Sequence, residues 1–137
     1  MSNRKIIRVR DVMLREFDIV NGRDTVSEAL ASLRHFAART MIVDKRHEDD
    51  EYGLVDFGGI ARQVLAKDRS PDRVNIYEIM TKPTLNAPPN MDIRFCARMF
   101  ERFRIHRAPV VEGGKIIGII SYEEMLQHWI HPAAEIS

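Results

Sequence analysis

The stretch RDVM at residues 10–13 returns as YEIM at residues 77–80, 67 positions further along the chain. Both copies place an acidic residue before a branched apolar residue and a methionine, and we call each copy a methionine box. Five apolar positions after each box repeat at the same distance: Val26, Ala29, Leu30, Leu33 and Phe36 in the first copy, and Ile93, Cys96, Ala97, Phe100 and Phe103 in the second. Self-similarity at one fixed distance predicts a duplicated structural unit.

The later apolar positions of each copy lie three, four, seven and ten residues after the first one, which is the spacing of one face of an α-helix. We therefore expect a helix of about three turns in each repeat. The first helix opens with a capping box at residues 25–28, and the segment 88–90, Pro-Pro-Asn, precedes the second.

Two β-strands and a second helix are expected to follow in each repeat. The first of these strands is predicted at residues 40–44 and 108–112, with an offset of 68 that implies a one-residue slip between the copies. The second strand is predicted at residues 52–55 and 117–120, and the last helix at about 58–67 and 122–129.

The order strand, helix, strand, strand, helix predicts an α/β fold in which two such units pack as one pseudo-twofold module. The first repeat is expected to span residues 8–68 and the second residues 74–131. Residues 67–73 are polar and contain a proline, so they are interpreted as the linker.

Composition excludes several classes of partner. The 137 residues have the size of one ordinary domain, and 21 Lys and Arg nearly balance 20 Asp and Glu, which argues against binding to nucleic acid or to an anionic membrane. No apolar run approaches the roughly 20 residues of a membrane span, and no secretory signal is visible, so we expect a cytoplasmic protein. The single cysteine, Cys96, falls on the apolar helix face and is interpreted as a packing residue in a reducing compartment.

The duplicated box, a Pro-Val-Val strand at residues 109–111 and the pattern Gly-x-x-Ser-x-x-acid at residues 118–124 together resemble a pair of cystathionine-beta-synthase (CBS) domains. The resemblance runs from about Val9 to Trp129. It implies a regulatory module whose clefts receive an adenine nucleotide, with AMP favoured and ATP, ADP, NAD or S-adenosylmethionine as alternatives. A carboxylate can accept both donors of a ribose diol, a purine needs an apolar slot, and phosphates favour basic groups.

The same resemblance implies the residues that contact the ligand in the second repeat. It assigns the ribose to Ser121 and Glu124, the adenine slot to Ala108, Pro109 and Ile120, and the phosphates to His106 and Arg107, with Lys82 and Thr84 at the border of the cleft. Ser121 and Glu124 can instead form a capping box at the start of a helix, and the two roles can coexist. The basic residues at 106–107 can instead complement the dipole of the preceding helix.

The first repeat departs from this pattern. Aligning Gly53 with Gly118 places Asp56 at the position of Ser121 and Gly59 at the position of Glu124, so the hydroxyl and the carboxylate are missing from their expected places. We expect Asp56 to cap the following helix, with a ribose contact as the alternative. Arg39, which precedes the strand, can supply charge to a phosphate.

Three further features have ordinary structural interpretations. The charged run at residues 44–51 is interpreted as a solvated, mobile hairpin tip, because a cation site needs spaced ligands and a turn glycine. Phe95, Phe100 and Phe103 have helical spacing and are expected in the core. Met125, Trp129 and Ile130 have no obvious cover within the chain, which predicts a homodimer.

Two hypotheses for the function follow. The first is a nucleotide sensor that passes occupancy to a regulated protein, and the second is a dimerisation module without a ligand, which the altered first repeat favours. An enzyme is not expected, because no nucleophile with a base, metal cluster or phosphate loop can be recognised.

Overall fold

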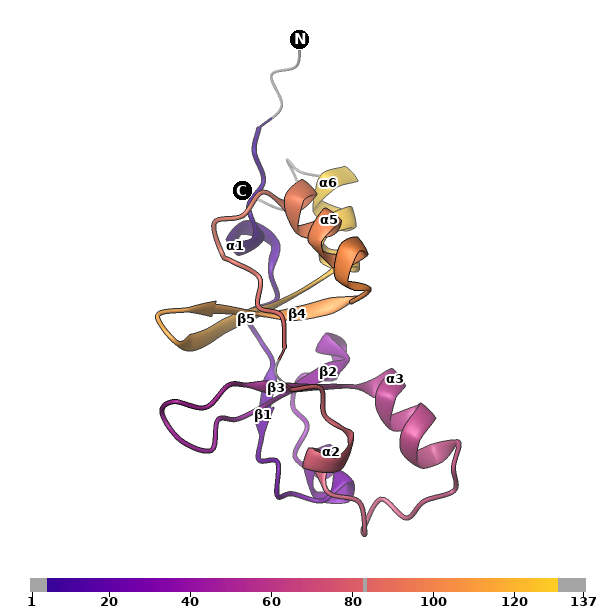
Figure 1. The fold of residues 1–137 in the computed structure, drawn as a ribbon. Coiled ribbons are helices and arrows are strands. Elements are labelled where there is room, and N and C mark those ends of the chain that lie inside the picture. Colours follow the sequence, from indigo (N-terminus) through magenta and orange to yellow (C-terminus); the bar gives the residue numbers. More distant parts are fainter. Residues whose placement is uncertain (1–4, 83, 131–137) are drawn as a thin grey trace. The chain divides into compact units, whose positions relative to one another are not determined.

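The computed structural model describes residues 5–82 and 84–130; residue 131, where the second repeat is expected to end, lies outside them. The chain forms two compact units, which we call the central unit (residues 16–84) and the terminal unit (residues 1–15 and 85–137) (Figure 1). Both units combine helices with strands, so the predicted α/β class is confirmed.

The central unit is built on a three-stranded sheet in the order β1, β2, β3, with β1 parallel and β3 antiparallel to β2. Its elements are β1 (Asp18–Val20), α2 (Val26–Ala31), the 3₁₀ turn η1 (Phe36–Ala38), β2 (Thr40–Val43), β3 (Gly53–Asp56), α3 (Phe57–Ile60), the π-helical turn η2 (Ala61–Leu65) and α4 (Ile76–Ile79). All four residues of β2 are buried, and Met41 and Val43 join residues of α2, α4 and β3 in one apolar core.

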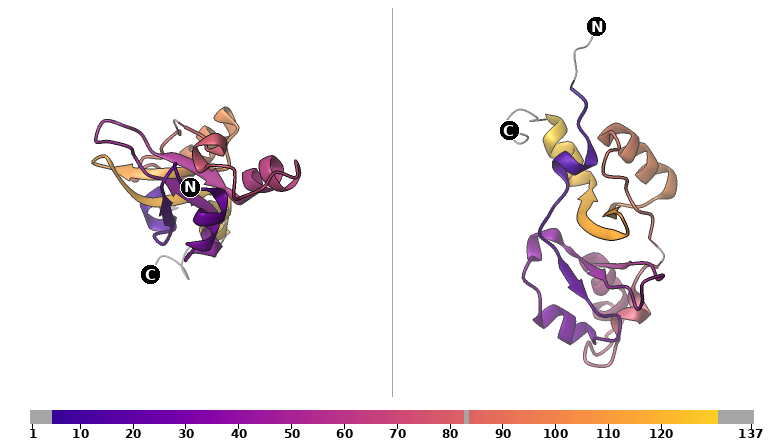
Figure 2. Two further views of the ribbon diagram at one scale, coloured as in Figure 1. Left: turned by 90° about the horizontal axis from the view of Figure 1, so that it is seen from below. Right: turned by 90° about the vertical axis from the view of Figure 1, so that its left-hand side faces the viewer.

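The terminal unit is built on an antiparallel hairpin. Its elements are α1 (Val9–Val12), α5 (Ile93–Phe103), β4 (Arg107–Glu112), β5 (Lys115–Ser121) and α6 (Tyr122–Ile130). Gly113 and Gly114 both have positive φ, which a two-residue hairpin turn requires and glycine adopts without strain. Helices α5 and α6 lie on the same side of the hairpin, where Phe100 and Met125 belong to the core (Figures 1 and 2).

Each methionine box packs in the unit of the other repeat. Leu14, beside the first box, exchanges backbone hydrogen bonds of 2.8 and 2.9 Å with Ile119 of the second repeat. Thr81, beside the second box, does the same with Leu54 of the first repeat at 2.8 and 3.0 Å. These two pairs of bonds occupy equivalent positions, so the duplication seen in the sequence is also a duplication of contacts.

Because the boxes are exchanged, the boundaries of the two compact units differ from those of the sequence repeats, which were predicted at 8–68 and 74–131. Residues 67–73, which we interpreted as the linker, form turns inside the central unit, where Pro71 accepts a hydrogen bond from the Ser27 N–H at 3.1 Å. The chain instead passes between the units at residues 15–16 and 84–85.

The predicted one-residue slip between the repeats is wrong. Val43 pairs with Gly53 across β2 and β3, and Val110 pairs with Gly118 across β4 and β5. Because the two glycines are equivalent, Val110 is the counterpart of Val43, and the strands keep the offset of 67 that the boxes have. The apolar pattern alone does not fix the alignment of β2 with β4, because neighbouring positions in both strands are also apolar.

The first repeat does not contain the predicted three-turn helix. Helix α2 has six residues, whereas α5 has the expected eleven. The backbone N–H groups of Arg34 and His35 bind the buried carboxylate of Asp18 at 3.1 and 3.0 Å, so this segment leaves the helical path. The first strand of the second repeat is also reduced, to a single parallel bridge between Ala87 and Val110.

The prediction for the phenylalanines of α5 is only partly confirmed. Phe100 is fully buried, but Phe95 and Phe103 are 53% and 55% exposed. The buried face of α5 is instead completed by Ile93 and Cys96, which lie on the same side of the helix as Phe100.

Candidate ligand-binding site

Ser121 and Glu124 meet at the corner where β5 leads into α6. Ser121 is the last residue of β5 and is only 3% exposed, and its hydroxyl donates a hydrogen bond to the Glu124 carboxylate. This contact joins the two side chains directly, whereas a capping box joins each side chain to a backbone N–H. A buried hydroxyl and a carboxylate therefore lie together, as the two groups that would face a diol must.

The residues assigned to the adenine slot are buried residues of β4 and β5 beside this corner. Ala108 pairs with Ile120 across β4 and β5, and both are fully buried. The carbonyl of Pro109 accepts a hydrogen bond from the Ala87 N–H at 2.9 Å. All three residues are therefore buried in the terminal unit, next to the polar corner.

Arg107 and His106 lie at the same end of the hairpin as Ser121. Arg107 pairs directly with Ser121 in the strand register, and its guanidinium lies 3.6 Å from the Glu123 carboxylate. The carbonyl of His106 accepts a hydrogen bond from the Tyr122 N–H at 3.4 Å. Sequence reasoning gave no role to Glu123, although it lies two positions from Ser121.

The equivalent corner of the central unit is used differently. Asp56 accepts a hydrogen bond of 2.6 Å from the Gly59 N–H and caps α3, which confirms the capping prediction. The corrected register places Thr40, which is fully buried and bonded to the Val55 carbonyl, at the position of Arg107. Arg39 precedes it, with a positive φ of 56°, and its carbonyl accepts from the Phe57 N–H at 3.0 Å.

Lys82 and Thr84 belong to the central unit. The ammonium group of Lys82 lies 2.7 Å from the Asp50 carboxylate, which also binds the Arg46 side chain at 2.9 Å. Hydrogen bonds from Arg46 and Lys82 hold the pKa of Asp50 well below its usual range. The Asp50 side chain is only 8% exposed, so the prediction of a solvated tip at residues 44–51 is wrong at this residue, because two cations fix it.

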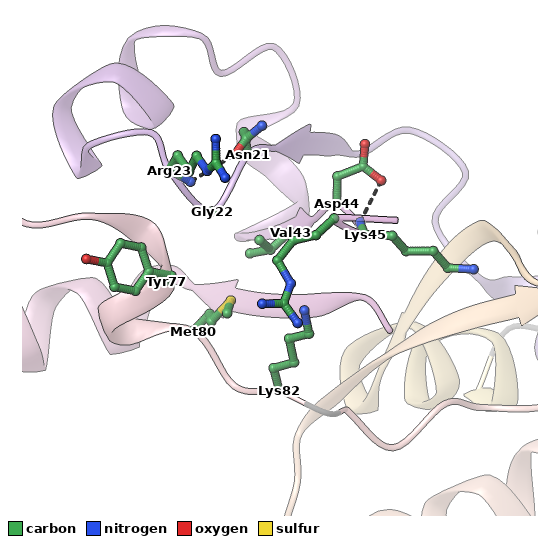
Figure 3. Close-up of a pocket in the computed structure, with 10 residues that line it drawn as sticks. Asn21, Gly22, Arg23, Val43, Asp44, Lys45, Tyr77, Met80 and Lys82 are labelled. Atoms are coloured by element: carbon green, nitrogen blue, oxygen red, sulfur yellow. Dashed lines mark hydrogen bonds between the residues drawn. The ribbon is translucent and has the colours of Figure 1, made fainter. Parts of the chain in front are cut away.

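A cavity of about 550 Å³ opens where β1 and β2 end (Figure 3). Its lining residues come from the turn after β1, the hairpin after β2 and the segment around α4: Asn21, Gly22, Arg23, Val43, Asp44, Lys45, Arg46, Tyr77, Met80 and Lys82. Sequence reasoning missed this cavity, because its cations are scattered over 60 positions. The signal that could have indicated this cavity is that two segments with basic residues directly follow two parallel strands, at the edge of the sheet where ligands commonly bind.

An apolar groove of about 310 Å³ runs between α5 and α6. Leu126 and Trp129 line it and are 53% and 54% exposed, and Ile130 is 55% exposed beside it. Met125, which we expected to be uncovered, is only 4% exposed, because it packs into the core of its own unit.

Two other candidate chemistries are not supported among the residues described. Cys96 is fully buried, and burial raises the pKa of its thiol to about 11, in agreement with the predicted packing role. Within residues 5–82 and 84–130, no three His, Cys, Asp or Glu side chains gather in a way that could hold a metal ion.

Comparison with known proteins identifies the family. The sequence model of the CBS domain matches residues 76–131. The chain is similar to the hexameric CBS-CP12 protein from bloom-forming cyanobacteria, with 34% identity, a TM-score of 0.84 and coverage of 88% of this chain and 70% of that chain. It is also similar to the CBS domain pair of protein MJ0100, in complex with 5′-methylthioadenosine and S-adenosyl-L-methionine, with 20% identity, a TM-score of 0.77 and coverage of 93% and 99%. A curated relative, the uncharacterized protein MK0525 of Methanopyrus kandleri, is 25% identical over 114 residues, which are 80% of this chain and 57% of that protein.

The chain therefore belongs to the CBS-domain family, as the two methionine boxes and the Gly-x-x-Ser-x-x-acid pattern predicted. It spans about half the length of the curated relatives that it matches. In the part of the chain that the structure describes, every helix is too short or too polar to cross a membrane.

Proposed function

We propose that this chain is a regulatory module, without enzymatic activity, that binds an adenosine-containing ligand at the Ser121–Glu124 corner of the terminal unit. The observation that carries the proposal is the buried Ser121 hydroxyl held against the Glu124 carboxylate, directly beside an apolar strand pair and Arg107. A carboxylate accepts both hydroxyl donors of a ribose, and the apolar residues at 108, 109 and 120 suit a purine.

A phosphate group would favour the basic end of the hairpin. Arg107 lies at the edge of the corner, 3.6 Å from the Glu123 carboxylate, and His106 precedes it in the chain. A guanidinium offers paired donors that match the oxygens of a phosphate. AMP is therefore the proposed ligand, with ATP, ADP, NAD and S-adenosylmethionine as alternatives; the ligands of the MJ0100 domain pair support the adenosine class.

The central unit is not expected to bind the same ligand in the same way. Asp56 is committed to capping α3, and Gly59 has no carboxylate where Glu124 stands in the other repeat. We therefore expect one strong adenosine site per chain. Ligand binding shifts the module between two arrangements only if the ligand prefers one of them, and a regulated partner protein would sense that shift in the cytoplasm.

The direct test is a thermal-shift titration with AMP, ATP, NAD and S-adenosylmethionine. A ligand at a hundredfold excess over its dissociation constant stabilises the folded state by about 2.7 kcal/mol, which raises the melting temperature measurably. We expect such a rise with at least one of the four compounds. No rise with any of them at millimolar concentration would support the second hypothesis, a dimerisation module without a ligand.

We also predict that two copies of the chain pair through the groove between α5 and α6. Half-exposed Leu126 and Trp129 leave apolar surface that a second copy can cover. Replacing Trp129 by Glu places a charge in this surface and should convert the dimer to a monomer, as measured by light scattering at micromolar concentration. Gln127→Glu adds the same charge at an exposed position of the same helix and should leave the dimer intact. A monomeric wild-type protein would contradict the prediction.

A further inference from the structure

The cavity at the ends of β1 and β2 has a surplus of positive charge. Four cations line it, Arg23, Lys45, Arg46 and Lys82, whereas three carboxylates are at hand: Asp44 in the lining, Asp50 behind it, and Asp24, which accepts a hydrogen bond from the Asn21 N–H at 3.3 Å. The surplus is therefore one positive charge. Cations held together in a concave site repel one another, and an anion that enters relieves this repulsion.

Two of these cations are held in fixed positions. Asp50 binds Arg46 at 2.9 Å and Lys82 at 2.7 Å, and the Lys82 side chain is only 16% exposed. One carboxylate can neutralise only one of the two, so a positive charge remains at the wall. Arg46 is 74% exposed, but the mostly buried Lys82 ammonium gains more from an anionic partner than an exposed lysine does, because water screens it less.

Arg23 completes the basic wall from another segment. The turn after β1 is closed by the Asn21 side chain, which accepts a hydrogen bond from the Arg23 N–H at 2.8 Å, and by the Asp24 N–H, which donates to the Asn21 carbonyl at 3.0 Å. Figure 3 shows Arg23 and Asn21 on one side of the cavity and Lys82 on the other. Parallel strands β1 and β2 end at this edge, which is where ligands bind in open α/β sheets.

The remaining lining is apolar and aromatic. Val43, Met80 and the half-exposed Tyr77 line the cavity together with the cations, and the volume of about 550 Å³ exceeds what one phosphate group fills. Gly22 lies against this apolar part, where an added Cβ would make ordinary van der Waals contact with Val43 and Tyr77 at 3.5 and 3.6 Å.

We propose that this cavity is a second ligand site of the chain and that it binds a phosphate chain, either inorganic or carried by an organic ester. Arg23, Arg46 and Lys82 contact the phosphates, and Tyr77 contacts the organic group when there is one. Arginine offers paired donors that match phosphate oxygens, and lysine adds a point charge. The site lies within the central unit and, apart from Lys82, which the family resemblance placed at the border of the adenosine cleft, uses none of the residues assigned to adenosine.

The test is calorimetric titration of the full chain with sodium tripolyphosphate at low and at physiological ionic strength. Wild-type protein is expected to bind, with an affinity that falls as salt rises. Arg23→Gln and Lys82→Gln are each expected to weaken binding about tenfold or more, the effect of removing a charged hydrogen bond. Arg23 is exposed, so its substitution tests the site even if loss of the Asp50 ion pair disturbs folding in Lys82→Gln.

Arg98→Gln is the matched control, because it removes an exposed cation that lies over the Phe95 ring in the terminal unit. It should bind tripolyphosphate as wild type does. The Tyr77→Ala substitution distinguishes the sources of phosphate when it is made in Glu124→Ala protein, which lacks the proposed ribose contact of the other site: weaker binding of ATP with unchanged binding of tripolyphosphate indicates an aromatic ester, and unchanged binding of both indicates an inorganic chain. The proposal is overturned if wild type does not bind millimolar tripolyphosphate, or if Arg98→Gln weakens binding as much as Arg23→Gln.

Discussion

Replacing Gly118 by alanine is expected to lower the free energy of unfolding by about 1–3 kcal/mol, the usual effect of overfilling a packed core. An added Cβ would lie 2.5 Å from the Met13 sulfur and 2.9 Å from the Leu14 carbonyl oxygen. The methionine can move aside, but the carbonyl is part of the backbone and accepts a hydrogen bond from the Ile119 N–H. The substitution therefore forces the methionine box away from β5, and a urea titration measures the loss.

Alanine substitutions at two other glycines serve as comparisons for the loss of stability expected from Gly118→Ala. At Gly53, the equivalent position, a Cβ would meet the Met80 sulfur at 3.0 Å and the Thr81 carbonyl oxygen at 3.4 Å, so a smaller loss is expected. At Gly22 the nearest atoms lie at 3.5 Å or beyond, which is ordinary van der Waals contact. If Gly118→Ala were no more destabilising than Gly22→Ala, the close packing of the box against β5 would not be important for stability.

Glu124→Ala is expected to weaken binding of AMP by a factor of about 10 to 150, which corresponds to the roughly 1.5–3 kcal/mol of a hydrogen bond to a charged group. The variant removes the carboxylate that Ser121 contacts and that the ribose is proposed to use. Arg107→Ala should weaken AMP more than adenosine, because only the phosphate needs the guanidinium. Calorimetric titration of folded protein measures both effects.

Asp56→Ala is the matched control in the other repeat. It removes the side chain that caps α3 and should lower stability by about 1 kcal/mol while changing AMP affinity little. A strong loss of affinity from Asp56→Ala, together with none from Glu124→Ala, would place the working site in the central unit.

The sequence was sufficient to predict the elements whose signals are local. The eleven-residue helix α5 shows its period over its whole length, and the capping box at residues 25–28 is formed as predicted, with Thr25 accepting from the Glu28 N–H at 3.0 Å. The contact between Ser121 and Glu124 was also predictable, because residues three apart at the start of a helix lie on one face.

Features that depend on distant residues could not be predicted in this way. Helix α2 ends early because Asp18, at the start of β1, binds the N–H groups at residues 34 and 35. Likewise, the duplication predicts two methionine boxes, but only the folded chain shows that Met13 packs on Gly118, 105 positions away, and Met80 on Gly53.

The charged hairpin at residues 44–51 likewise depends on a contact with a distant residue, which the sequence did not predict. The run at residues 44–51 contains both signs of charge and is typical of a solvated loop. Lys82, which follows the second methionine box, reaches Asp50 and converts part of this loop into the wall of a cavity. A single sequence carries no local signal for an ion pair between residues 32 positions apart.

The proposed ribose contact is tested most directly by titrating wild-type protein and Glu124→Ala with AMP and with 2′,3′-dideoxy-AMP, which lacks both ribose hydroxyls. This double comparison isolates the coupling between the carboxylate and the diol from all other effects of either change. We predict that wild type prefers AMP about tenfold or more and that Glu124→Ala shows almost no preference. An equal preference in the two proteins, or none in wild type, would contradict the proposal that Glu124 holds the ribose.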